Sequence, residues 1–256
     1  MRSRSALEGG PPMPLRVGFD LDGTVADMHA ALRDAARALF GTDVSSQGAP
    51  DGEPLAKATD VEVAASGTGE PLPIPALDHL RLTPRQRRRL WDHVMAIENF
   101  WTTLPELEPG VIARIARTAT ERRWEVIFLT MRPSAAGDMT QRQSQQWLDA
   151  HGFQYPSVMV VQGLRGRIVD ALQLDAFVDD RIENCHAIAL ESKATAILVW
   201  PDDLKNVHPA ATRAGVRPVG TIAAAIDLLE EIDDARQQSA LVRSIRRVLR
   251  RGRAKV

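Results

Sequence analysis

Cysteine is almost missing from this sequence: Cys185 is the only one, so no internal disulfide can form. A chain without disulfides suits a reducing compartment, and we expect a cytoplasmic protein. Long apolar runs are missing too, since nothing reaches the roughly 18 consecutive apolar residues of a membrane span. The first residues include two arginines and then Glu8, glycines and prolines. We therefore expect neither a signal peptide nor a membrane span.

An excess of charge of either sign is also missing. Lys+Arg number 32 and Asp+Glu number 33, which gives a formal net charge of −1. This balance argues against nucleic-acid binding by the chain as a whole. A hydrophobic content of 44% and a charged content of 25% are ordinary for a globular protein. A length of 256 residues accommodates one large domain, or a core with a smaller second module.

Short apolar segments alternate with segments of helical periodicity along most of the chain. We expect strands at 15–19, 124–129, 157–161, 176–178 and 195–200. We expect helices at 26–39, 83–99, 110–122, 140–151, 165–172, 182–191 and 221–232. This alternation, with strands that are nearly continuously apolar, predicts an α/β fold: a Rossmann-like parallel sheet with helices on both faces.

The predicted core is interrupted and extended by segments of different composition. Residues 15–40 and 109–234 carry the strand and helix pattern. We expect residues 1–14 to be a disordered leader. Residues 41–108 begin with a stretch rich in glycine, proline, serine and acids, and continue into a helix. We expect a flexible insertion followed by a small helical cap there. Residues 235–256 form a basic C-terminal helix or tail.

Two carboxylates follow the first predicted strand, in the run Asp20-Leu21-Asp22-Gly23-Thr24. Like charges at close range repel each other unless a cation or a proton joins them. Open α/β sheets bind ligands at the carboxyl ends of their strands. The pair therefore predicts a hard metal ion and an anionic substrate. The simpler alternative is an acidic turn in which Asp22 or Thr24 caps the next helix.

Further polar groups follow other predicted strands. Thr130 ends one strand, and the acidic pair Asp179-Asp180 ends another. Arg165 and Arg167 supply cations at the start of a helix between them. Because the carboxyl ends of parallel strands share one edge of the sheet, we expect these groups to converge on a single cleft.

These elements, in this order, resemble the haloacid dehalogenase-like (HAD) phosphohydrolase superfamily. Its signature is Asp-x-Asp-x-Thr, then a strand-end Thr or Ser, a Lys or Arg, and an acidic pair. The resemblance covers about residues 15–200 and implies a HAD core that hydrolyses phosphomonoesters. It implies that Asp20 attacks phosphorus and forms an aspartyl-phosphate, and that Asp22 acts as general acid and then as general base. Thr130 would donate a hydrogen bond to a phosphoryl oxygen.

The cofactor implied by the resemblance is Mg²⁺, which prefers oxygen ligands and keeps several waters. Asp20, the backbone carbonyl of Asp22 and Asp180 would be its protein ligands. Asp179 would lie behind Asp180, and Asn184 would support the ligands from the next helix.

At the cationic position most members of the superfamily have a lysine. This sequence has none there, because no lysine lies between Lys57 and Lys193. Arg165-Gly166 matches the usual Lys-Gly best, and Arg167 is the competitor. Arginine binds phosphate through two parallel hydrogen bonds, but it is larger and planar, so the exchange is not conservative. A solvated charge at a helix start is the alternative for either arginine.

The segments 98–101 and 104–110, and the triplet that follows Thr130, are similar to the 5′(3′)-deoxyribonucleotidase group. This similarity implies a nucleoside monophosphate as the small phosphorylated substrate. Thr24 and Arg132 would bind the substrate, and the alternative for Arg132 is a solvated side chain in its loop. Phe100 and Trp101 would stack on the base. The alternative is that both rings only pack the cap against the core.

From Leu241 the chain reads as a basic amphipathic helix, with apolar residues in one stripe and arginines mostly opposite. Such a helix can bind an anionic membrane surface or nucleic acid, but we favour its docking on the core. The expected function is a Mg²⁺-dependent phosphatase, with sugar phosphates or nucleic-acid ends as alternative substrates. The alternative from another class is a weakly catalytic or non-catalytic scaffold that binds a partner through this tail.

Overall fold

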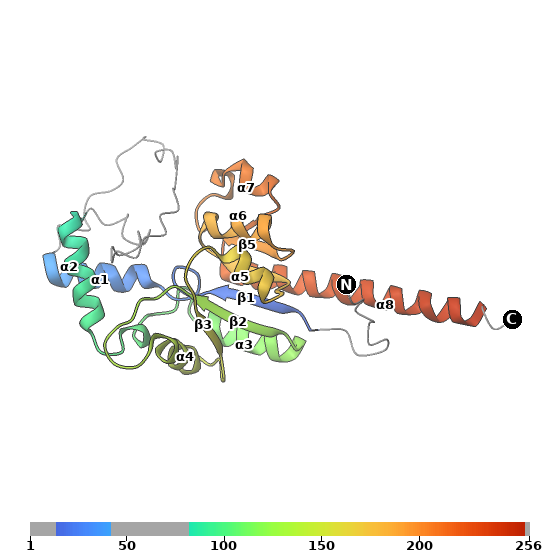
Figure 1. Cartoon of the computed structure of the whole chain (residues 1–256), viewed down its shortest axis with the longest axis horizontal. Helices are drawn as coiled ribbons and strands as arrows, with labels where there is room; N and C mark the ends of the chain where they lie inside the picture. Colours follow the sequence, from blue (N-terminus) through green and yellow to red (C-terminus); the bar gives the residue numbers. More distant parts are fainter. Residues whose placement is uncertain (1–13, 42–81, 254–256) are drawn as a thin grey trace.

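The computed structural model describes residues 14–41 and 82–253, with side chains described up to residue 239. Its strands form one parallel sheet in the order β3-β2-β1-β4-β5-β6 (Figure 1). The strands are β1 (Arg16–Asp20), β2 (Glu125–Thr130), β3 (Ser157–Val160), β4 (Ala176–Asp179), β5 (Thr195–Val199) and β6 (Arg217–Val219). The first strand thus lies in the middle of the sheet, where the strand order reverses direction.

Helices cover both faces of this sheet. The helices of the described residues are α1 (Met28–Phe40), α2 (Pro84–Ala96), α3 (Val111–Arg122), α4 (Thr140–Ala150), α5 (Arg165–Ala171), α6 (Ile182–Glu191), α7 (Pro209–Arg213) and α8 (Ile222–Arg253), with 3₁₀ turns η3 (Phe100–Thr102) and η4 (Leu204–Asn206). Helices α3, α4 and α8 lie on one face of the sheet, and α5, α6 and α7 on the other (Figure 1). Their buried side chains belong to two separate apolar clusters. The prediction of an α/β, Rossmann-like parallel sheet with helices on both faces is confirmed.

Alternate side chains of the central strands enter opposite cores, as strand geometry requires. In β4, Val178 packs in the core with α3 and α8, whereas Phe177 packs in the core with α5 and α6. On β1, a Cβ at Gly18 would lie 2.2 Å from the Phe177 ring, so no side chain fits there. Asp20 is two residues beyond Gly18 and therefore faces the same side, toward α5.

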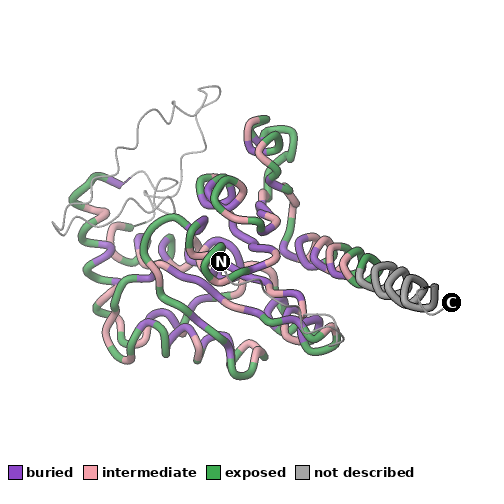
Figure 2. Tube along the Cα trace, turned by 45° about the vertical axis from the view of Figure 1, so that its right-hand side comes forward, coloured by how far each residue is buried: buried purple, intermediate pink, exposed green. Residues whose placement is uncertain are grey.

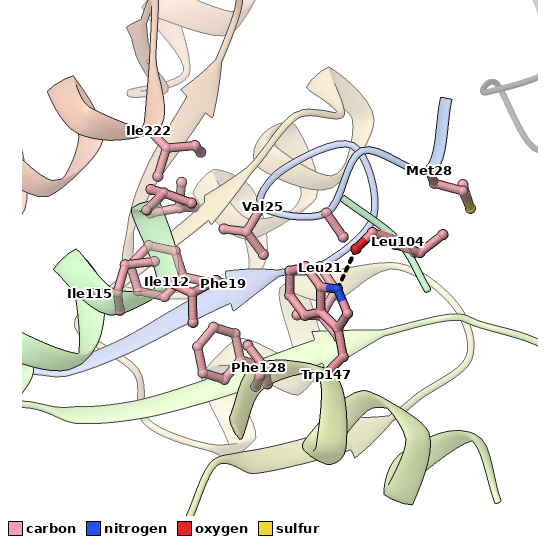
Figure 3. Close-up of a cluster of buried hydrophobic side chains, with 14 of the residues drawn as sticks. Phe19, Leu21, Val25, Met28, Leu104, Ile112, Ile115, Phe128, Trp147 and Ile222 are labelled. Atoms are coloured by element: carbon pink, nitrogen blue, oxygen red, sulfur yellow. Dashed lines mark hydrogen bonds between the residues drawn. The ribbon is translucent and has the colours of Figure 1, made fainter. Parts of the chain in front are cut away.

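The core on the side of α3, α4 and α8 joins distant parts of the chain (Figures 2 and 3). The rings of Phe19 and Phe128 on adjacent strands have centroids 5.9 Å apart. The Trp147 indole N–H of α4 donates to the Leu104 carbonyl oxygen at 2.7 Å (Figure 3). Trp91 of α2 belongs to the same apolar cluster. The part of the predicted insertion that the structure describes is thus packed against the core.

The short elements β6, α7, η3 and η4 were not expected from the sequence. β6 is a three-residue edge strand that contains Pro218, and both properties hide a strand from pattern analysis. The expected helix 221–232 and the basic tail form one helix, α8, because no glycine or proline occurs between Thr221 and Arg251. Residues 1–13 of the leader and residues 42–81 lie outside the described residues, as do the side chains of the basic tail from residue 240 onward.

Of the helices in the described part of the chain, none combines the length and the apolar character that a bilayer crossing requires.

Candidate active site

The strand register brings the predicted site residues to one edge of the sheet. Asp20 ends β1 opposite Leu129 of β2, so Thr130 follows one residue beyond that level. Phe19 is opposite Val178 of β4, so Asp179 reaches the level of Asp20 on the other side. The side-chain contacts described next show that the two acidic pairs, Thr130 and Arg165 lie together.

The turn after β1 packs directly against the second acidic pair. Thr24 is fully buried, and its hydroxyl donates to Asp180 Oδ1 at 3.0 Å. Gly23 has a φ of +84°, and a Cβ there would lie 2.3 Å from Asp180 Oδ2. Glycine is thus required both for the backbone angle and for the space. Thr24, predicted to bind the substrate, holds a carboxylate in this structure.

Arg165 reaches the first aspartate from the start of α5. Its Nη2 forms a buried ion pair with Asp20 Oδ1, and its Nε lies 3.9 Å from Asp179 Oδ2. Its Nε and Nη1 are buried without a hydrogen-bond partner in the described part of the chain. Arg167 is exposed, so Arg165 is the arginine at the site. At Gly166 a Cβ would lie 2.5 Å from the Ala187 carbonyl oxygen, so glycine allows α5 to approach α6 closely.

Arg132 binds the other carboxylate of the first pair. Its Nε donates to both Asp22 oxygens at 2.9 Å, and its Nη2 donates to Asp22 Oδ1 at 2.7 Å. Its Nη1 donates to the Ser144 hydroxyl of α4 at 3.0 Å. The Thr130 hydroxyl donates to Asp22 Oδ2 at 3.2 Å and accepts the Arg132 backbone N–H at 3.1 Å. Arg132 and Thr130, predicted to contact substrate, both hold Asp22 here.

Two tryptophans enclose the Arg132 guanidinium. Its Cζ lies 5.0 Å from the Trp101 ring centroid and 6.0 Å from that of Trp147. Phe100 and Trp101 are 4% and 0% exposed, and their ring centroids are 5.1 Å apart. Both rings are buried in this arrangement, against each other and, for Trp101, against the Arg132 guanidinium.

The second acidic pair has different environments for its two members. Asp179 is fully buried and accepts from the Arg181 backbone N–H at 2.8 Å and from Asn184 Nδ2 at 2.9 Å. Burial raises the pKa of Asp179 well above its ordinary value, and the charge of Asp20 adds to the effect. Burial, and next the charge of Asp20, raise the pKa of Asp180 to about 7. Burial also raises the pKa of Asp20, although the Arg165 charge opposes it.

The charges at this edge favour a divalent cation. The carboxylates of Asp20, Asp22, Asp179 and Asp180 exceed the two guanidinium groups by two negative charges when all are ionised. Within the described ranges, no three acidic, histidine or cysteine side chains are already arranged around a cation position. Mg²⁺ needs only one or two protein carboxylates, because it keeps several waters. The oxygen donors and the unbalanced charge therefore fit this ion.

Residues that the sequence analysis missed support the site from α4. Gln143 and Ser144 are fully buried, and Gln143 Oε1 accepts the Trp101 backbone N–H at 3.1 Å. Thr140, Gln143, Ser144 and Trp147 share the buried face of the helix. Polar residues at core-facing helical spacing were the available signal, because buried polar groups need specific partners.

The acidic segment 104–110 caps two helices. The Glu106 carboxylate accepts the backbone N–H groups of Gly110 at 2.6 Å and Ile112 at 2.9 Å, at the start of α3. The Glu108 carboxylate accepts those of Ile222 at 2.6 Å and Ala223 at 3.1 Å, at the start of α8. These residues suggested a resemblance to nucleotidases, but here they satisfy helix N-termini.

No known family model matches the chain, and no curated protein matches it. Solved structures similar to it include a proposed β-phosphoglucomutase from Thermotoga maritima, with 18% identity over 85% of this chain and 99% of that one and a TM-score of 0.48. A hydrolase from Pseudomonas syringae has 18% identity over 86% and 99% of the two chains and a TM-score of 0.45. A HAD family hydrolase from Deinococcus radiodurans R1, with bound phosphate and sodium, has 17% identity over 86% and 96% and a TM-score of 0.46.

Proposed function

We propose that this protein is a divalent-metal-dependent phosphomonoester hydrolase of the HAD type. The observation that carries the proposal is the pairing of Asp20 with Arg165, whose Nε and Nη1 are buried without a hydrogen-bond partner within the described ranges. A buried donor without a partner costs free energy unless a ligand accepts its hydrogen bond. A phosphoryl group next to Asp20 would supply the acceptor oxygens, and guanidinium groups bind such oxygens well.

The residues support a reaction in two steps. In the first, an Asp20 oxygen forms a bond to phosphorus while the bond to the leaving oxygen breaks, and Asp22 gives its proton to that oxygen. In the second, water attacks phosphorus, Asp22 takes a proton from the water, and the bond between Asp20 and phosphorus breaks. Arg165 holds the phosphoryl oxygens through both steps, where charge is spread over them.

Asp20, the backbone carbonyl of Asp22 and Asp180 would hold the Mg²⁺ ion. The ion supplies positive charge beside the phosphoryl oxygens, where negative charge is concentrated. Asn184 and the Arg181 backbone N–H hold Asp179 in place behind these groups.

A nucleoside monophosphate remains the proposed substrate, and sugar phosphates or nucleic-acid ends remain the alternatives. The burial of Phe100 and Trp101 removes base stacking by these rings as a reason to prefer nucleotides. The replacement of the usual lysine by arginine is the best support for the alternative of a non-catalytic scaffold. The contact of Arg165 with Asp20 argues against it, because a cation occupies the position next to the nucleophile.

The test is phosphate release from a panel of phosphomonoesters with and without Mg²⁺. The panel holds 5′- and 3′-nucleotides, sugar phosphates, a 3′-phosphorylated oligonucleotide and an aryl phosphate. We expect turnover that requires Mg²⁺ and disappears in Asp20→Asn. The matched control is Asp149→Asn, which removes an exposed carboxylate of α4 and should keep full activity. Release that persists in Asp20→Asn, or no release on any substrate, would contradict the proposal.

A further inference from the structure

Arg132 has few donors left for a ligand. Each of its three guanidinium nitrogens already donates to a protein acceptor, either Asp22 or the Ser144 hydroxyl. Its side chain is fully buried, and the side chain of Asp22 is 13% exposed. The carboxylate of Asp22 is thus the more accessible of the two groups, and it occupies two of the three guanidinium nitrogens of Arg132.

We propose that Arg132 is a positioning residue that fixes the carboxylate of Asp22 for proton transfer. This inference rests on the proposed function, because it concerns the group assigned there as acid and base. The fork of the guanidinium contacts both oxygens of Asp22, which fixes the plane of the carboxylate as well as its distance. A catalytic acid must be held close to its productive geometry, because small displacements lower the rate strongly.

The loop that carries Arg132 is itself held from two sides. The Trp101 indole N–H donates to the Pro133 carbonyl oxygen at 3.1 Å, and the Ala136 N–H donates to the Met95 carbonyl oxygen at 2.8 Å. The Gln143 amide of α4 donates to the Ala136 carbonyl oxygen at 3.2 Å. The segment 95–101 therefore acts on the chemistry by holding this loop, and its aromatic pair encloses the arginine.

A positioning role predicts a loss that depends on the leaving group. Asp22 must protonate a poor leaving group such as an alkoxide, but a dinitrophenolate leaves without a proton. Without Arg132 the first step should therefore slow for alkyl phosphates and change little for dinitrophenyl phosphate. The second step, in which Asp22 takes a proton from water, should slow for both. The phosphorylated enzyme should then accumulate.

The experiment compares Arg132→Gln and Arg132→Lys with the wild type in Mg²⁺, using 2,4-dinitrophenyl phosphate and a simple alkyl phosphate. For Arg132→Gln we expect turnover of the alkyl phosphate to fall about 100-fold, within the usual range for lost acid–base catalysis. The burst of dinitrophenolate in the first turnover should keep a rate close to that of the wild type, followed by slow steady-state release. Arg132→Lys keeps the positive charge but not the forked guanidinium. Its turnover of the alkyl phosphate should lie between that of the wild type and that of Arg132→Gln. Arg114→Gln, which breaks the ion pair with Asp227 far from the site, is the matched control.

The outcomes separate the roles that Arg132 could have. An equal loss of burst rate on both substrates with a raised KM would mean that Arg132 binds phosphate, and would overturn the proposal. An equal loss at unchanged KM with a lowered melting temperature would mean that it only supports packing, and would also overturn it. A wild type that releases nothing from either substrate would instead reject the proposed function itself.

A second readout does not depend on activity. Thermal unfolding of Arg132→Gln, Asp22→Asn and the double variant measures how strongly the two side chains are coupled. We expect the double variant to be less destabilised than the sum of the single variants. Additive effects would show that the two side chains are not coupled, and would overturn the positioning role even if all variants kept some activity.

Discussion

Arg132 and Arg165 make an instructive pair within one site. Both are buried, at 3% and 1% exposure. Arg132 forms an ion pair with Asp22, and Arg165 forms one with Asp20. They differ in how many of their nitrogens have protein partners. All three of Arg132 donate hydrogen bonds, whereas Nε and Nη1 of Arg165 have no hydrogen-bond partner among the described residues, although Nε lies 3.9 Å from Asp179 Oδ2. The number of unused donors, and not burial or charge, separates a group that can bind a ligand from one that holds a neighbour.

The two arginines also differ in what surrounds them. Arg132 is enclosed by two indole rings and by α4, so its position is fixed from several sides. Arg165 is placed by the close approach of α5 to α6, which Gly166 permits. The first arrangement surrounds the guanidinium with permanent partners. The second leaves Nε and Nη1 of Arg165 without a hydrogen-bond partner, so an anionic ligand would bind most favourably at these two nitrogens.

The largest effect is expected from removing Arg165. Arg165→Ala should lower kcat/KM by roughly 10²–10³-fold, the usual cost of losing one preorganised donor to a developing charge. The loss should be equal for alkyl and aryl phosphates, because in the proposed reaction Arg165 would contact the phosphoryl group of both. Steady-state kinetics on the two substrates measures this. Arg165→Lys should recover part of the activity, and Arg167→Ala, at the exposed neighbour, should match the wild type. A loss that depends on the leaving group would erase the distinction between the two arginines.

The next effect concerns the pH dependence of stability in the metal-free protein. Burial raises the pKa of Asp180 from 3.8 to about 7, so the folded state binds more protons than the unfolded state between these values. The free energy of unfolding should therefore fall as the pH rises through this window. Asp180→Asn should remove this contribution, and the variant should be the more stable protein at high pH by a few kcal/mol, at about 1.4 kcal/mol for each pKa unit.

Urea unfolding in a chelator across this pH range is the measurement. Asp149→Asn, at an exposed position, should leave the pH profile unchanged. Mg²⁺ should reduce the advantage of Asp180→Asn at high pH, because the ion stabilises only the state that binds it. If the stability of the wild type instead rises relative to that of Asp180→Asn between pH 3.8 and about 7, the carboxylate of Asp180 is well paired without metal.

The smallest effect concerns the turn beside Asp180. Gly23→Ala and Gly110→Ala both place a Cβ on a backbone with positive φ, of +84° and +78°. The unfolding free energy of each variant should fall by about 1–2 kcal/mol because of the positive φ alone. Only at position 23 would the Cβ meet a neighbour, at 2.3 Å from Asp180 Oδ2. We expect Gly23→Ala to be the less stable variant and to bind Mg²⁺ more weakly. Equal unfolding free energies and Mg²⁺ affinities would mean that Asp180 moves aside without cost.

Much of the site could be predicted from the sequence, because its members follow strands. The two acidic pairs and Thr130 each end a strand, and parallel strands bring such residues to one edge. The role of Arg132 could not be predicted in this way. Its partners include Ser144 and Trp147 on α4, and their position under the loop after β2 depends on tertiary packing. The burial of Phe100 and Trp101 could not be predicted for the same reason, because the sequence does not show which way a ring faces.

The place of β1 in the sheet also governs when this site can exist during synthesis. The contacts of Arg165 with Asp20 and of Thr24 with Asp180 span 145 and 156 residues. Contacts of such length form late, because closing long segments of chain costs entropy first. A nascent chain that ends before β4 carries the whole first motif but has one side of β1 unpaired. The surroundings of Asp20 are therefore completed only when most of the protein has been made, so that partial chains should lack the proposed activity.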